Sequence, residues 1–158
     1  MQSNMQHFLF LHSALRYFIL IFAVMVALQS LVGMMGKKEF KKGNKQVALS
    51  LLIFCDLQLR LGALLYYYKV IASGMLSAGN VMKDTYSRFY AVEHSVAMIL
   101  GIVLVHVCYN AAKKNMDADR KFKKMFWCSF LALGMFTAMI PWQGKPVVGR
   151  PNIPQMTP

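Results

Sequence analysis

The sequence predicts an all-α integral membrane protein, a four-helix bundle whose N-terminus and C-terminus both lie on the non-cytoplasmic side. Hydrophobic residues make up 57% of the 158 residues, above the roughly 45–50% apolar content of soluble domains. They form four continuous runs of about 18 to 28 residues, and about 20 suffice to cross a 30 Å hydrocarbon core. Basic residues gather in two of the intervening loops. The length suits a single transmembrane domain, 1–158.

The first predicted span covers about 8–35. It is apolar apart from His12, Arg16 and Gln29. No basic residue precedes this run, so it lacks the charged region that opens a secretory signal. We therefore expect the segment to be kept as a transmembrane helix.

The second predicted span covers about 47–71 and carries Asp56, Gln58 and Arg60 near its middle. Three consecutive tyrosines at 66–68 mark its far end. Aromatic side chains of this kind gather at the membrane–water interface, so the span should end there. A loop of small and polar residues follows.

The third predicted span, about 89–112, carries Glu93 and His94 close to its start. The fourth, about 125–142, is the shortest. A tail rich in Pro and Gly, 143–158, is expected to be irregular. Because the four runs are continuous rather than alternating, helices and not barrel strands should satisfy the backbone polar groups inside the membrane.

Lysine and arginine set the predicted orientation. Eleven lie in the first and third loops, and five lie on the opposite side. Basic loops stay in the cytoplasm, so both termini should lie outside. The net charge of +12 thus reflects topology and not nucleic-acid binding, which needs a basic face on a soluble fold. We expect a multi-pass protein of the bacterial inner (cytoplasmic) membrane, with the lipid bilayer as its surroundings.

Two histidines within the predicted spans suggest a cofactor. Ionisable residues inside a span cost about 2.5–3.5 kcal/mol on insertion scales and are candidates for function. His12 lies roughly 5 Å, and Arg16 roughly 11 Å, from the outer end of the first span. Glu93 and His94 lie roughly 6–8 Å from the outer end of the third. Two imidazoles at one depth on two helices can ligate one heme iron from both faces. We predict His12 and His94 as ligands, oriented by Arg16 and Glu93.

Other residues suit the same cofactor site. Gly101 shares a helix face with His94 and would let a flat macrocycle approach the backbone. Arg88 and Lys69, at the outer end, would bind heme propionates. Two alternatives use the same histidines. In one they only hydrogen-bond backbone carbonyls, and in the other they line a pocket for a quinone or another small molecule.

Polar residues of the second span form a separate group. Asp56 and Arg60 are four residues apart and can pair on their own helix. Gln58 points to another face, which it shares with Gly62, as in a close helix contact. His106 is too deep to share a metal with the outer histidines, and we expect it to be hydrogen-bonded within the bundle. The alternative is a proton conduit that uses Asp56, Arg60 and His106.

The remaining reactive residues predict no catalytic centre. Cys55, Cys108 and Cys128 lie in apolar runs without CxxC spacing, so we expect free thiols and neither a disulfide framework nor a zinc site. The sequence contains no glycine-rich phosphate loop and neither the HExxH nor the GxSxG motif.

Four strings in this order resemble a known family. They are HSALRY at 12–17, QLRLGALLY at 58–66, RFYAVEH at 88–94 and IPW at 140–142. Together they resemble the small four-span membrane proteins of Bacteroidetes that are commonly labelled cytochrome b, over nearly the whole chain. The resemblance implies a b-type heme and points to five residues: His12, Arg16, Gln58, Glu93 and His94. The chain departs from the family at Asp56, where members often carry histidine.

These observations favour a b-type heme protein that passes single electrons, with a link to quinol. Two other functions stay open. One is a non-enzymatic accessory subunit of a larger inner-membrane complex, and the other is a proton or small-solute conduit. Four spans without an internal repeat make transport by a single copy less favourable. We expect a homo-oligomer or a subunit of a larger membrane assembly.

Overall fold

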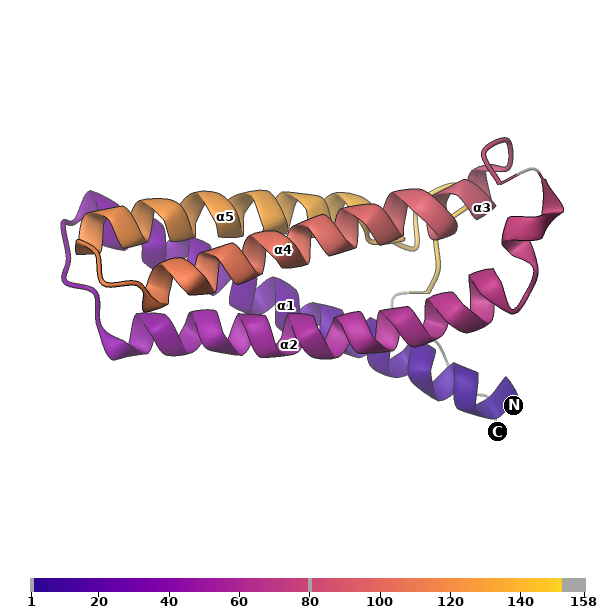
Figure 1. The fold of residues 1–158 in the computed structure, drawn as a ribbon, viewed down its shortest axis with the longest axis horizontal. Coiled ribbons are helices and arrows are strands. Elements are labelled where there is room, and N and C mark those ends of the chain that lie inside the picture. The colour runs from indigo at the N-terminus through magenta and orange to yellow at the C-terminus, as the bar shows by residue number, and fades with distance from the viewer. Residues whose placement is uncertain (1, 80, 152–158) are drawn as a thin grey trace.

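The computed structural model describes residues 2–79 and 81–151, and this part of the chain contains helices and turns but no strand. Four long helices run through it, as Figure 1 shows. They are α1 (Gln2–Met35), α2 (Lys42–Tyr66), α4 (His94–Lys113) and α5 (Ala118–Met139). The prediction of an all-helical fold is thereby confirmed for the described residues.

The four long helices pack in a ring in the order α1, α2, α4 and α5. Neighbours in the ring run antiparallel (Figure 1). Short turns at 36–41 and 114–117 join them at one end, which we call the basic end because the two lysine-rich loops lie there. The other end holds the start of α1, the connecting residues 67–79 and 81–84, and residues 140–151 of the tail. We call it the outer end. The rest of the predicted irregular tail, 152–158, lies outside the described residues.

Three helices are long and apolar enough to cross a membrane, namely Met5–Met35, Lys42–Ile71 and Thr85–Lys113. The fourth predicted span corresponds to α5, which forms as a helix but is less apolar. The reason lies in its first turns, where Lys121, Lys123 and Lys124 interrupt the apolar run. By length and composition, three of the helices are therefore candidates to span a membrane.

The start of α2 is fixed by an exchange of hydrogen bonds with α1. Asn44 Oδ1 accepts from the backbone N–H of Lys41 at 2.9 Å, and Asn44 Nδ2 donates to Gln29 Oε1 at 3.2 Å. Gln29 Nε2 in turn donates to the carbonyl of Asn44 at 3.1 Å. One of the orphan donors at the helix start is thus satisfied, and the polar Gln29 inside α1 has a structural partner.

The centre of the ring is built from small side chains. Ala23, Ala48 and Ala132 are fully or almost fully buried, and two glycines receive aromatic rings from α5. A Cβ on Gly33 would lie 2.5 Å from Phe122, and one on Gly101 would lie 2.4 Å from Phe136. Small residues at helix interfaces let membrane helices pack closely. The glycine at position 101 therefore leaves space for the Phe136 ring.

Two wide helical turns lie at the outer end. η1 (Tyr67–Ile71) extends α2, and η3 (Phe89–Glu93) leads directly into α4. The hydroxyl of Tyr66 donates to the carbonyl of Ala91 at 3.2 Å and ties these two turns together. Wide turns of this π type are rare and often lie at functional sites. Here one of them ends at His94.

The short helices of the outer connection are η2 (Met75–Ala78) and α3 (Thr85–Arg88). Asp84 caps α3, because its carboxylate accepts from the backbone N–H of Ser87 at 2.8 Å. Hydrogen bonds from the side chain and then from the backbone N–H of Ser87, which favour the ionised form, lower the pKa of Asp84 below its ordinary value.

The Asp84 cap should be sensitive to acid. Since the folded pKa is depressed, the cap stabilises α3 at neutral pH and is lost as the pH falls through the folded pKa. We expect the Ser87 amide signal in an NMR titration to move toward its unfolded position as the carboxylate protonates. In Asp84→Asn the amide oxygen still caps the helix, so the same titration should be flat. An identical titration in both proteins would contradict the cap.

Candidate functional site

His94 is held by the end of α5. Its Nδ1 lies 2.9 Å from the carbonyl oxygen of Met139. This carbonyl belongs to the last turn of α5, where no intrahelical donor follows. Because a carbonyl only accepts, Nδ1 carries the hydrogen and Nε2 keeps its lone pair. The ring is therefore fixed in the tautomer that a metal ligand requires.

His12 lies between α1 and α2. A Cβ on Gly62 would come within 3.4 Å of the imidazole Cε1, so the glycine makes room for the ring. Gln58 Nε2 donates to the backbone carbonyl of His12 at 2.8 Å. The predicted close contact at Gln58 and Gly62 is thus present, and its partner is His12. Within the described part of the chain, His12 Nδ1 and Gln58 Oε1 are buried without a hydrogen-bond partner.

The two histidines belong to one region at the outer end. Arg16, one turn after His12 on α1, lies 5.7 Å from the Trp142 ring centre, and Trp142 follows Met139, whose carbonyl oxygen lies 2.9 Å from His94 Nδ1. These contacts bring the outer part of α1 and the start of α4 to the same end of the bundle. The same arrangement gives this region a surplus of positive charge.

Arg16 is buried among aromatic side chains of this region, with 8% of its surface exposed. Its guanidinium lies 5.0 Å from the ring centre of Tyr17 and 5.7 Å from that of Trp142. Stacking of this kind suits a guanidinium in a site shielded from water. Arg16 also donates to the Tyr17 hydroxyl at 3.3 Å.

Glu93 pairs with Arg88, whose Nε lies 2.7 Å from the Glu93 carboxylate. The two residues are five apart, and the wide turn η3 brings such positions to one side of the helix. Arg88 also donates to the carbonyl of Met82 at 3.2 Å. Glu93 therefore binds Arg88, the arginine that the sequence analysis assigned to a heme propionate.

The tail folds back over the outer end. Tyr90 donates its hydroxyl to the carbonyl of Val148 at 2.8 Å, and Arg150 lies 4.2 Å from the Tyr90 ring centre. Arg150 also donates to the Tyr86 hydroxyl at 2.6 Å. These contacts place Arg150 against Tyr90, whose ring centre lies 6.3 Å from that of His94. The tail was predicted to be irregular, and no sequence period signals this long-range arrangement.

Cations outnumber carboxylates at this end. Lys145 lies 5.8 Å from the Phe89 ring centre and Arg150 lies 4.2 Å from the Tyr90 ring centre, and Lys69 lies in η1 at the same end. Among the described residues, the carboxylates of this end are Asp84, which caps α3, and Glu93, which binds Arg88. A site of this charge fits an anionic ligand. Together with two imidazoles and an aromatic wall, the site suits a ligand that is flat, apolar and anionic at its edge.

A second polar group lies on the outside of α2 and α4. His106 Nε2 is 2.9 Å from Asp56 Oδ1, and the two side chains are 47% and 41% exposed. The prediction that Asp56 would pair with Arg60 is wrong, because the carboxylate reaches across to α4 instead. The expected hydrogen bond of His106 is present. Within residues 2–79 and 81–151, no group of three metal-ligating side chains occurs here or elsewhere.

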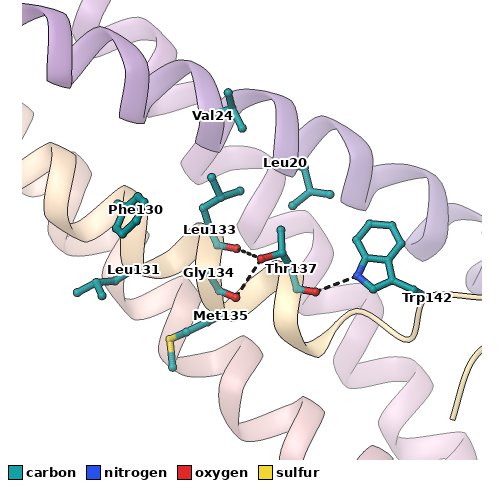
Figure 2. A pocket seen from close by; sticks show the side chains of 9 residues that line it. All are labelled: Leu20, Val24, Phe130, Leu131, Leu133, Gly134, Met135, Thr137 and Trp142. Carbon is teal, nitrogen blue, oxygen red and sulfur yellow. Dashed lines mark hydrogen bonds between the residues drawn. The ribbon is translucent and has the colours of Figure 1, made fainter. Parts of the chain in front are cut away.

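A shallow apolar groove of about 700 Å³ lies between α1 and α5 (Figure 2). Leu20, Val24, Phe130 and Trp142 line it, and the Thr137 hydroxyl is bonded to carbonyls of its own helix. Such a lining suits acyl chains of the bilayer. None of the predicted site residues contributes to it.

In comparisons with protein-family models, with curated proteins and with solved structures, no match to this chain was found. The function must therefore follow from the chemistry of the outer end.

Proposed function

We propose that this protein is a b-type heme protein of the bacterial cytoplasmic membrane that passes single electrons, with quinol as a redox partner. The observation that carries the proposal is the pair of imidazoles at the outer end. His12 and His94 come from two different helices at the same end of the bundle, where Arg16, one turn from His12, lies 5.7 Å from the Trp142 ring centre and the Met139 carbonyl orients His94.

The membrane arrangement in this proposal has four spans. α5 packs against α1 and α4, two of the helices that are apolar enough to cross, so it is expected to share their depth. The lysines at its start then lie with the two basic loops on the cytoplasmic side. Both termini and the histidine pair face the outer leaflet.

The donor set fits a heme. Two neutral imidazoles are the axial ligands of low-spin b-type hemes held in helix bundles. His94 offers Nε2 because Nδ1 is bound to Met139, and His12 has a buried ring nitrogen free of hydrogen bonds among the described residues. Arg150, Lys145 and Lys69 would meet the propionates. When bound, the heme iron supplies the chemistry by accepting and releasing one electron.

The chain contributes position and electrostatics. The Met139 carbonyl fixes the His94 ring and increases the basicity of the imidazole. Phe89 and Tyr90, whose ring centres lie 5.8 and 6.3 Å from that of His94, shield it from water. Buried Arg16 and the cations of the rim stabilise added negative charge, and we expect them to raise the reduction potential.

The test is spectroscopic. The full-length protein, purified in mild detergent from heme-replete cells, should contain stoichiometric heme by the pyridine hemochrome assay. Its reduced-minus-oxidised spectrum should be of the b type, and a short-chain quinol should reduce it. A colourless protein that also fails to take up added hemin would overturn the proposal. Reduction by dithionite but not by quinol would support heme binding and contradict the proposal that quinol is the redox partner.

A further inference from the structure

Three ionisable side chains lie on the side of the bundle formed by α2 and α4, on the surface that faces away from the centre of the ring. Asp56 and His106 bond to each other across the two helices, and Arg60 lies one turn along α2 from Asp56. Asp56 and Arg60 are near the middle of the candidate span Lys42–Ile71. These groups therefore lie at the depth of the hydrocarbon core while pointing away from the centre of the ring.

Contact with lipid acyl chains is energetically unfavourable for the ionisable groups of this face. An ionisable group near the middle of a span costs about 2.5–3.5 kcal/mol, and such groups normally face the bundle interior or a polar partner. Arg60 is exposed and has no hydrogen bond or ion pair within the described part of the chain. Around the polar group lie exposed apolar side chains, among them Ile53, Ile99 and Val103. The face thus has a polar centre surrounded by exposed apolar side chains, and polar groups at this depth are normally satisfied by a neighbouring helix.

We infer that the α2–α4 face binds a second copy of this chain. Its charges are self-complementary, because each face carries one carboxylate and one guanidinium. A two-fold axis along the membrane normal places equal depths opposite each other. Arg60 is about 6 Å further along the helix than Asp56, a distance that an extended arginine side chain covers. Arg60 of each copy can then bind Asp56 of the other.

The geometry at Asp56 leaves room for this pairing. His106 occupies Oδ1, and Oδ2 has no hydrogen bond to the described residues, so it is available to a guanidinium. A partner helix of a single charge sign would satisfy Asp56 or Arg60 but not both. A second copy satisfies both, and in a low-dielectric setting such reciprocal pairs favour one register. This inference does not rest on heme binding.

Cross-linking in native membranes tests the contact without changing the charges. The parent for this experiment is Cys128→Ala, which removes the partly exposed thiol. In that parent, Val103→Cys should form a disulfide-linked dimer with a mild oxidant. Ile21→Cys, an equally apolar and exposed position on α1, is the matched control and should stay monomeric. Equal cross-linking at both positions, or none at Val103→Cys, would overturn the inference.

Charge exchange tests the pairing itself. Asp56→Arg and Arg60→Asp each place like charges opposite each other and should lower the dimer fraction in lipid nanodiscs at least tenfold. When the two single variants are co-expressed with different tags, they should associate with each other in preference to themselves. The double exchange should dimerise again. A wild-type protein that is monomeric in lipid, or bound to a different protein in one-to-one ratio at this face, would contradict a second copy.

Discussion

Replacing Gly101 by alanine should weaken the packing of α4 on α5. The new Cβ would lie 2.4 Å from Cε1 of Phe136 and 3.0 Å from its Cδ1. Phe136 is only 4% exposed, so its ring has little space to move. Overpacking of this kind costs about 1–3 kcal/mol, occasionally more. An unfolding titration in mixed micelles, followed by circular dichroism, measures the loss.

The matched control is Gly134→Ala on the facing helix. No atom lies within 4 Å of the Cβ it would add, and alanine favours a helix over glycine by about 1 kcal/mol in water. This variant should be at least as stable as the wild type. Phe136→Leu, which shortens the ring side chain, should recover part of the loss in the Gly101→Ala background. If Gly101→Ala is as stable as the control, the Phe136 ring does not occupy this contact.

Hydropathy predicted which segments are helical but not the residues at which the helices begin. The first predicted span begins at about 8, whereas α1 begins at Gln2. The second begins at about 47, whereas α2 begins at Lys42. Hydropathy follows the thickness of the hydrocarbon core, while helices continue through the polar interface as long as their backbone hydrogen bonds are made.

Depth could also be predicted, because each residue adds about 1.5 Å along a helix. This is why His12 and His94 were expected at one depth, and they lie toward the outer end on α1 and at the start of α4. The rotation of each helix could not be predicted in the same way. Asp56 was expected to pair along α2, but α2 and α4 turn its carboxylate toward His106. The rule that residues four apart can pair considers one helix alone, so it cannot predict a partner on the neighbouring helix.

The wide turn η3 explains the placement of Arg88 and Glu93. In a regular helix, positions five apart diverge by about 140°, so no sequence rule brings these two together. In η3 they meet at 2.7 Å, and Ser95 likewise bonds the carbonyl of Tyr90 five residues earlier at 2.9 Å. The sequence of Phe89–Glu93 carries no proline or glycine that would signal the wide turn.

His12→Ala and His94→Ala should each abolish the bis-histidine heme spectrum, because the loss of one axial ligand leaves an iron with a single protein bond. His106→Ala is the internal control, since His106 binds Asp56 on the outside of α2 and α4, and it should retain the full heme content. Absorbance spectra and heme-to-protein ratios of the purified variants measure the effect.

His94→Gln separates ligation from folding at this position. A glutamine amide can still donate to the Met139 carbonyl that now accepts from Nδ1, so thermal stability should stay near that of the wild type. The amide does not replace imidazole as a low-spin iron ligand, so the spectrum should be lost. Added imidazole should restore it in His94→Gly, where the removed side chain leaves space for the free ligand. If His94→Gln keeps the wild-type spectrum, or if His106→Ala loses it, the iron is held elsewhere and the role of His94 is to anchor the end of α5.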